Sequence, residues 1–199
     1  MSIFSRVIAG YMKMSKCYPY TVQMVQTGLL MAGGDVIAQQ FIEKTDKHDW
    51  LRTKQFAVLG VLFVAPVTTT WYRYLDKIYR PHNVSTSNLR AMRIIGLKKM
   101  CTDQIIFAPL FLASLLLIIG RLKCKKWEQN VDDVRAQYKD VILANYTVWP
   151  FVQLVNFTFV PVHMQVLLVQ IAALFWNTFI SWRTAKTIDD TPPKTSKKD

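Results

Sequence analysis

Seven polar side chains lie inside or at the ends of long uncharged runs, and they are the residues of this sequence best placed for chemistry. They are two carboxylates and five amides: Asp35, Asp103, Gln39, Gln104, Gln153, Asn156 and Asn177. A carboxylate or amide within an apolar segment needs a hydrogen-bonding partner, which is either a neighbouring helix or water in a conduit. These residues are therefore candidates for lining a pore or for joining helices, and the sequence leaves both roles open.

No pattern in the sequence is typical of an enzyme, a metal site or a cofactor site. It contains no Gly-rich phosphate loop, no His-Glu-x-x-His and no Gly-x-Ser-x-Gly. The three histidines stand far apart, and the three cysteines lack the spacing of zinc ligands. Asp35 and Asp103 could meet as an aspartyl dyad, but neither has the sequence setting of intramembrane aspartyl proteases. We therefore predict that the protein is not an enzyme and that it has no metal and no cofactor.

The elements that carry these side chains are indicated by the distribution of charge. The 199 residues include 25 Lys and Arg against 13 Asp and Glu, a net charge of +12, yet four long runs have no charged residue: 17–34, 55–72, 104–120 and 141–182. Since about 20 helical residues cross a lipid hydrocarbon layer, the first three runs each fit one crossing and the last fits about two. We predict an all-α integral membrane bundle with four or five hydrophobic helices. A nucleic-acid-binding protein would interleave its basic and apolar residues, so we expect no direct nucleic-acid partner.

Proline and small residues predict how these helices bend and pack. Four prolines lie within the uncharged runs, where each removes a backbone donor and can kink a helix: Pro66, Pro109, Pro150 and Pro161. We expect Pro161 to divide the last run into two helices. Gly28 and Ala32 form a small-xxx-small pair, which allows two helices to approach closely in lipid.

An amphipathic segment and four aromatic residues predict contacts with the membrane interface. Apolar residues recur at helical spacing from Trp127 to Val141, which predicts an amphipathic helix lying in the interface or packed on neighbouring loops. Aromatic residues near the ends of the runs are expected anchors at headgroup level: Trp71, Tyr72, Trp127 and Trp182. The lipid bilayer is thus the expected partner, with anionic lipids at the basic loops.

The sequence predicts one domain with a polar tail. Residues 1–183 form the membrane-embedded helical domain, and residues 184–199 are polar, include Pro192-Pro193 and are expected to be disordered. The orientation stays open, because the side with more basic residues reverses between four and five crossings.

A set of paired motifs along nearly the whole chain resembles a known family. The motifs are Tyr18-Pro19, Gly34-Asp35, Ala38-Gln39, Pro66, Trp71-Tyr72, Leu75-Asp76, Lys98-Lys99, Asp103-Gln104, Ala108-Pro109, Trp149-Pro150, Gln153, Asn156-Phe157, Val160-Pro161, Trp176-Asn177 and Ser181-Trp182. Together they resemble the Mpv-seventeen / peroxisomal membrane protein 22 kDa family, and the segment from Asn145 to His163 is most similar to its mitochondrial inner-membrane member. The sequence departs from the common pattern at Ala65, Thr69 and Gln165; at the last, most members have an arginine.

The resemblance implies a small multi-span organelle protein, usually described with four spans. It implies the mitochondrial inner membrane, with the peroxisomal membrane as the alternative. It also implies a weakly selective pore for small solutes or ions that supports mitochondrial homeostasis, including membrane potential, reactive oxygen species and mitochondrial DNA maintenance. A non-conducting scaffold or assembly factor is the alternative, and self-association into a homo-oligomer is left open.

Overall fold

The chain folds into helices that together form an elongated bundle. The computed structural model describes residues 10–11, 13–15, 17–79, 89–159 and 162–189. Its elements are α2 (Pro19–Ile37), η1 (Ala38–Glu43), α3 (Trp50–Leu59), η2 (Gly60–Val64), α4 (Ala65–Ile78), α5 (Leu89–Thr102), η3 (Asp103–Phe107), α6 (Ala108–Leu122), α7 (Trp127–Phe159) and α8 (Val162–Asp189). The three η elements are π-helical, and every element of the described residues is a helix. This confirms the predicted all-α class.

Two of the continuous helices are long and apolar enough to cross a membrane. Within the described residues these are Trp50–Ile78, which joins α3, η2 and α4, and Ile94–Leu122, which joins most of α5 with η3 and α6. Their mean hydropathies are 1.3 and 2.4. Large apolar side chains also cover the outside of the bundle; Leu29, Leu62 and Ile105 are about 70% exposed. Such a surface suits lipid better than water. The count of four or five crossings stays a prediction.

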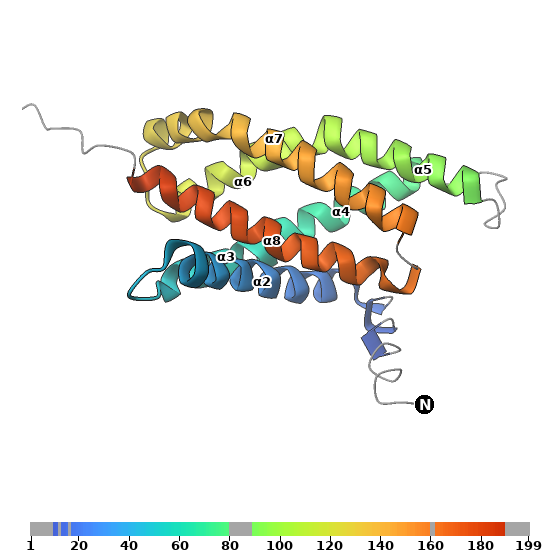
Figure 1. The fold of residues 1–199 in the computed structure, drawn as a ribbon, viewed down its shortest axis with the longest axis horizontal. Helices are drawn as coiled ribbons and strands as arrows, with labels where there is room; N and C mark the ends of the chain where they lie inside the picture. The colour runs from blue at the N-terminus through green and yellow to red at the C-terminus, as the bar shows by residue number, and fades with distance from the viewer. Residues whose placement is uncertain (1–9, 12, 16, 80–88, 160–161, 190–199) are drawn as a thin grey trace, which may run out of the picture.

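The helices run along the long axis of the bundle, as Figure 1 shows. α8 lies between α2 and α7 and contacts both, while α6 packs against α7 and α2 packs against α3 and α4. The buried apolar core draws Met31, Phe56, Leu112, Leu116 and Ile180 from four of these helices. Burying apolar side chains of this size contributes roughly 1.5–3 kcal/mol each in water, and in lipid close packing replaces much of that effect.

Gly28 and Gly34 of α2 allow its closest contacts with neighbouring helices, η2 and α8. A Cβ built on Gly60 would lie 2.9 Å from the Thr27 carbonyl oxygen and 3.0 Å from the Cα of Gly28. There is therefore no room for a side chain where η2 and α2 cross. A Cβ on Gly34 would lie 2.8 Å from the backbone nitrogen of Thr178 in α8. The predicted close approach at Gly28 is therefore present, with Gly60 as its partner.

Two of the four prolines follow π-helical turns. Pro66 comes just after η2 and Pro109 just after η3, each in the first turn of an α-helix. The Thr68 hydroxyl donates to the Val64 carbonyl oxygen at 2.7 Å, which satisfies a backbone group next to Pro66. Pro150 lies inside α7, and Pro161 lies outside the described residues.

The structure differs from the expected elements in two places. The amphipathic segment from Trp127 to Val141 is not a separate helix, because α7 continues through it to Phe159 and packs on α6. Its buried face includes polar residues as well as Val141, and the Asn130 side chain donates to the Leu117 carbonyl oxygen at 2.8 Å.

The second difference is the start of the polar tail. α8 extends to Asp189, so a disordered tail starting at Thr184 is placed too early. Thr184 is buried, its hydroxyl donates to the Ile180 carbonyl oxygen at 2.9 Å, and its own carbonyl accepts from Lys123 at 2.8 Å. A polar residue with such partners continues a helix as well as an apolar one does. Residues 190–199 lie outside the described residues.

Candidate functional site

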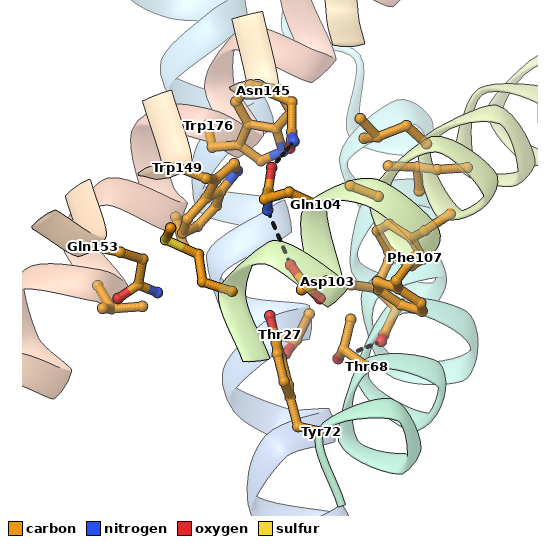
Figure 2. A pocket seen from close by; sticks show the side chains of 18 of the residues that line it. Thr27, Thr68, Tyr72, Asp103, Gln104, Phe107, Asn145, Trp149, Gln153 and Trp176 are labelled. Carbon is orange, nitrogen blue, oxygen red and sulfur yellow. Dashed lines mark hydrogen bonds between the residues drawn. The ribbon is translucent and has the colours of Figure 1, made fainter. Parts of the chain in front are cut away.

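A cavity of about 500 Å³ lies inside the bundle, between α2, α4, η3, α7 and α8. Its polar and aromatic lining includes Gln23, Thr27, Thr68, Tyr72, Asp103, Gln104, Asn145, Trp149, Gln153, Gln170, Trp176 and Asn177. Figure 2 shows several of these side chains, among them Thr27, Asp103 and Trp149, reaching one space from different helices. A volume in this range, with apolar walls and a few polar groups, is typical of small-molecule sites.

The carboxylate of Asp103 is held at the cavity by uncharged donors. The Trp71 Nε1–H donates to Oδ1 at 2.8 Å, and the Gln104 Nε2–H donates to Oδ2 at 3.0 Å. Among the described residues no cation forms an ion pair with Asp103, and Lys99, one turn earlier, pairs instead with Asp76 at 2.5 Å. Within the part of the chain that the structure describes, the negative charge of Asp103 therefore has hydrogen bonds but no counter-charge.

A chain of hydrogen bonds fixes this carboxylate relative to the facing helix. The Asn145 Nδ2–H of α7 donates to Gln104 Oε1 at 2.7 Å, and Gln104 in turn donates to Asp103 (Figure 2). Trp71 of α4 completes the chain from the other side. Three helical segments, α4, η3 and α7, are thereby joined at the cavity wall.

Aromatic rings form much of the remaining wall. Phe107 stacks on Trp71 with ring centroids 4.9 Å apart and on Phe111 at 5.0 Å. Trp149 and Trp176 meet edge to face at 6.2 Å, which joins α7 to α8 across the cavity. Aromatic faces of this kind attract cations and stack on planar groups.

Three further amides at the cavity keep their hydrogen-bonding capacity. In the described part of the chain, the side chains of Gln153, Gln170 and Asn177 have no hydrogen-bond partner, although all three line the cavity. An amide offers two donors and one acceptor oxygen. The cavity therefore contains groups that a solute or water can use.

Comparison with known proteins identifies the group to which this sequence belongs. A model described as the Mpv17 / PMP22 family matches residues 120–181. The chain is 38% identical to the mitochondrial inner membrane protein Mpv17 of Danio rerio, over 89% of this chain and 96% of that protein. It is 36% identical to the Mpv17 protein of Homo sapiens, over 87% and 95%, and 33% identical to that of Caenorhabditis elegans, over 86% and 89%. The chain belongs to the Mpv17/PMP22 family.

Membership of the Mpv17/PMP22 family confirms the resemblance that the motifs indicated. The relatives are named mitochondrial inner membrane proteins, which confirms the expected location in the mitochondrial inner membrane. Their names describe a membrane protein rather than an enzyme. No solved structure matches this fold significantly. The segment matched by the family model, residues 120–181, includes Asn145, Trp149, Gln153, Trp176 and Asn177, which form one wall of the cavity.

Four of the seven predicted polar residues meet at this cavity. Asp103, Gln104, Gln153 and Asn177 line it, whereas Asp35 and Gln39 do not. The side chain of Asn156 lies outside those that the structure describes.

Asp35 and Gln39 belong instead to a buried network at the end of the bundle where α2 ends and α3 begins. Three neutral donors reach the Asp35 carboxylate: Ser181 Oγ at 2.5 Å, Thr53 Oγ1 at 2.6 Å and Gln39 Nε2 at 2.8 Å. Asp35 and Gln39 are 0% and 1% exposed. Gln39 Oε1 also accepts from the backbone N–H of Asp49 at 2.7 Å, which fixes the turn into α3.

Arg52 supplies the positive charge of this network, which we call the Arg52 network. Its Nε lies 2.7 Å from Asp35 Oδ1, a charge contact in which the N–H is not aligned for a hydrogen bond. Its two terminal nitrogens donate to the two Glu43 oxygens at 2.7 Å each. Nη2 also donates to Ser181 at 2.7 Å, so one guanidinium joins η1, α3 and α8. Planar, bidentate pairing of this kind is the strong form of ion pair.

Lys123 lies next to the same network, just after α6. Its Nζ donates to the Thr184 carbonyl oxygen at 2.8 Å. Burial, with the positive charges of Arg52 and Lys125 nearby, lowers the pKa of Lys123 to about 8. The network end of the bundle therefore holds a second cation that is partly desolvated.

The four expected interface anchors have different surroundings. Trp71 binds Asp103, Tyr72 lines the cavity and Trp182 is half-buried beside Phe179. Trp127 begins α7 with an exposed ring. Anchoring at the headgroup level stays a prediction for these residues.

Several site residues were not found from the sequence. Asn145 lies one turn before Trp149 and two turns before Gln153, so helical spacing could have placed it on the same face. Arg52, Thr53 and Ser181 carry no comparable signal, because a charged or hydroxyl residue near the end of an apolar run is ordinary.

Proposed function

We propose that this protein is a weakly selective pore or channel for small solutes in the mitochondrial inner membrane, where it supports mitochondrial homeostasis. The observation that carries the proposal is a cavity with several polar side chains in its wall, inside a bundle whose outside is apolar. Amides and hydroxyls with free capacity can replace part of the hydration of a passing solute. The membrane potential, reactive oxygen species and mitochondrial DNA maintenance are the processes that such a flux would affect.

The cavity would form one part of such a conduit. Beyond it, the apolar core around Leu116 and Ile180 and then the Arg52 network fill the bundle. Passage therefore requires helices to move apart or a second copy of the chain to contribute a wall. The π-helical turns η2 and η3, which contribute Val64, Asp103, Gln104 and Phe107 to the cavity wall, are points where helix packing can change.

Flux through purified protein tests this proposal. The full chain is reconstituted into liposomes, and swelling or release of small solutes is compared with empty liposomes and with a Gln153→Leu variant. We expect solute flux that the apolar substitution reduces, because it removes a free amide from the cavity. If the wild-type chain gives no flux above empty liposomes at any membrane potential, pH or redox condition, the proposal is wrong.

A non-conducting scaffold is the second candidate, and the packed apolar core together with the Arg52 network favours it. In that case the hydrogen-bonded chain from Asn145 to Trp71 serves only to join helices, each bond contributing roughly 0.6–2 kcal/mol. The same variant separates the two candidates. A scaffold predicts no flux in either protein, with Gln153→Leu altering only thermal stability or self-association.

A further inference from the structure

We propose that the cavity binds small organic cations, with the positively charged group seated at Asp103. This inference rests on the proposed solute function of the cavity and adds the class of solute to it. It starts from a difference between the two carboxylates of the uncharged runs. Asp35 has Arg52 as its counter-charge, whereas Asp103 has no cationic partner among the described residues.

The unpaired charge of Asp103 is the first argument. A buried or partly buried carboxylate is usually paired, because an isolated charge is costly away from water. Its two hydrogen-bonding partners among the described residues, Trp71 and Gln104, are neutral donors. Two carboxylate oxygens offer about four acceptor sites, so space for hydrogen bonds to an ammonium group remains. Lys99 also lines the cavity, but its ammonium group is paired with Asp76.

The walls of the cavity provide the second argument. A cation over the face of an aromatic ring is attracted by the ring quadrupole. Trp149, Trp176 and Phe107 line the cavity together with the Tyr72 phenol, and Figure 2 shows Asp103 between Tyr72 and Gln104 with Trp149 opposite. A carboxylate framed by aromatic rings suits an amine better than an anion or a purely neutral solute.

The free amides provide the third argument and add to the description of the ligand. Gln153 and Asn177 have donors and acceptors available at the cavity. A ligand that also carries hydroxyl or amide groups would satisfy them, while a purely apolar amine would leave them unpaired at a cost. The expected ligand is therefore an amine with additional hydrogen-bonding groups.

Three sugar derivatives of almost equal size test the charge preference directly. N-methylglucamine is cationic at neutral pH, sorbitol is neutral and gluconate is anionic. Each is titrated into the purified full chain in lipid nanodiscs at low ionic strength, and tryptophan emission reports binding because Trp149 and Trp176 line the cavity. We expect saturable binding of N-methylglucamine, at least about tenfold tighter than sorbitol, and weaker binding still for gluconate. Equal binding of all three would overturn the inference.

The Asp103→Asn variant assigns the preference to its residue. It should bind N-methylglucamine and sorbitol equally, whereas the control Asp140→Asn, which removes an exposed carboxylate paired with Arg183, should keep the wild-type preference. Unchanged preference in Asp103→Asn would overturn the inference. Where that variant fails to fold, the comparison of the three ligands on the wild-type chain still decides.

Liposome flux of the same three compounds separates this inference from the proposed function. Selective binding without flux supports the cation site and contradicts the pore. Flux that does not distinguish the three compounds, with no selective binding, supports the pore and overturns the cation site.

Discussion

Asp35 and Asp103 are both carboxylates of apolar helices, but their surroundings differ in one decisive way. Asp35 is fully buried and receives three hydroxyl or amide donors in addition to the guanidinium of Arg52. Asp103 is half-buried, receives two neutral donors and faces a cavity. Among the described residues, the first carboxylate has a cationic partner and the second has none. A completed network is suited to holding helices together, and an incomplete one is suited to meeting a ligand.

The largest effect should follow from breaking the completed network. Asp35→Asn leaves Arg52 with Glu43 alone at a buried site, and removing one partner of a buried ion pair typically costs about 3–5 kcal/mol. We expect a loss of that size in the free energy of unfolding, measured by SDS titration in mixed micelles. The matched control is Asp140→Asn, whose exposed pair with Arg183 should contribute less than about 1 kcal/mol. Similar losses in the two variants would contradict the assignment.

The pH dependence of the free energy of unfolding tests the electrostatics around Lys123, next to the Arg52 network. The pKa of Lys123 is lowered to about 8 in the folded protein, whereas an unfolded lysine keeps a value near 10.4. Between these values the unfolded chain binds more protons, so stability rises with pH. Relative to Lys123→Met, the wild-type free energy of unfolding should rise by up to about 3 kcal/mol from pH 7 to about pH 10. The exposed neighbour Lys126, changed to Met, should give no such difference; an equal effect there would refute the prediction.

A smaller effect is expected from the hydroxyl that connects Asp35 to Arg52. Ser181→Ala removes a donor to the Asp35 carboxylate and an acceptor for Arg52 Nη2, and each loss leaves a buried group less satisfied. We expect about 1–2 kcal/mol of destabilisation. Ser114, whose exposed hydroxyl donates only to the Leu110 carbonyl within its own helix, is the control and should be close to neutral when changed to alanine. If both variants unfold alike, the bridge across the helices contributes nothing.

The smallest effect on stability should come from substitution of Asp103. Asp103→Asn leaves no cation of the described residues unpaired and can keep the acceptor for Trp71, so we expect a change below about 1 kcal/mol. Its effect should appear in ligand binding instead. A loss of stability as large as that of Asp35→Asn would place Asp103 in the structural framework rather than in a binding site.

The sequence predicted the membrane character of the chain and four of its cavity residues for a clear physical reason. Uncharged runs and the polar side chains in or next to them are local properties: Gln104, Gln153 and Asn177 lie in such runs, and Asp103 directly precedes one. The role of Asp35 was left open between conduit and helix contact, because its pairing with Arg52 depends on how the turn after η1 directs α3 back along α2. That turn is held by Gln39 and Asp49 and cannot be derived from hydropathy.

The two predicted helix boundaries that differ from the structure, near Val141 and near Arg183, have a related cause. The segment around Val141 changes from amphipathic to apolar, which suggested two helices, but it has neither glycine nor proline to interrupt the backbone. Polar residues also continue α8 past Arg183, since Thr184 finds backbone partners. Composition changes therefore marked changes of environment rather than ends of helices.

The π-helical turn η3 has a consequence for how Asp103 and Gln104 reach the cavity. Such a turn holds a surplus residue relative to an α-helix, and each residue of an α-helix advances the side-chain direction by roughly 100°. Deleting one residue between Asp103 and Phe107 would convert the turn to a regular helix and rotate α5 against α6 by about that angle. The leucines of α6 would keep their place, while the carboxylate and its amide neighbour would swing toward the lipid.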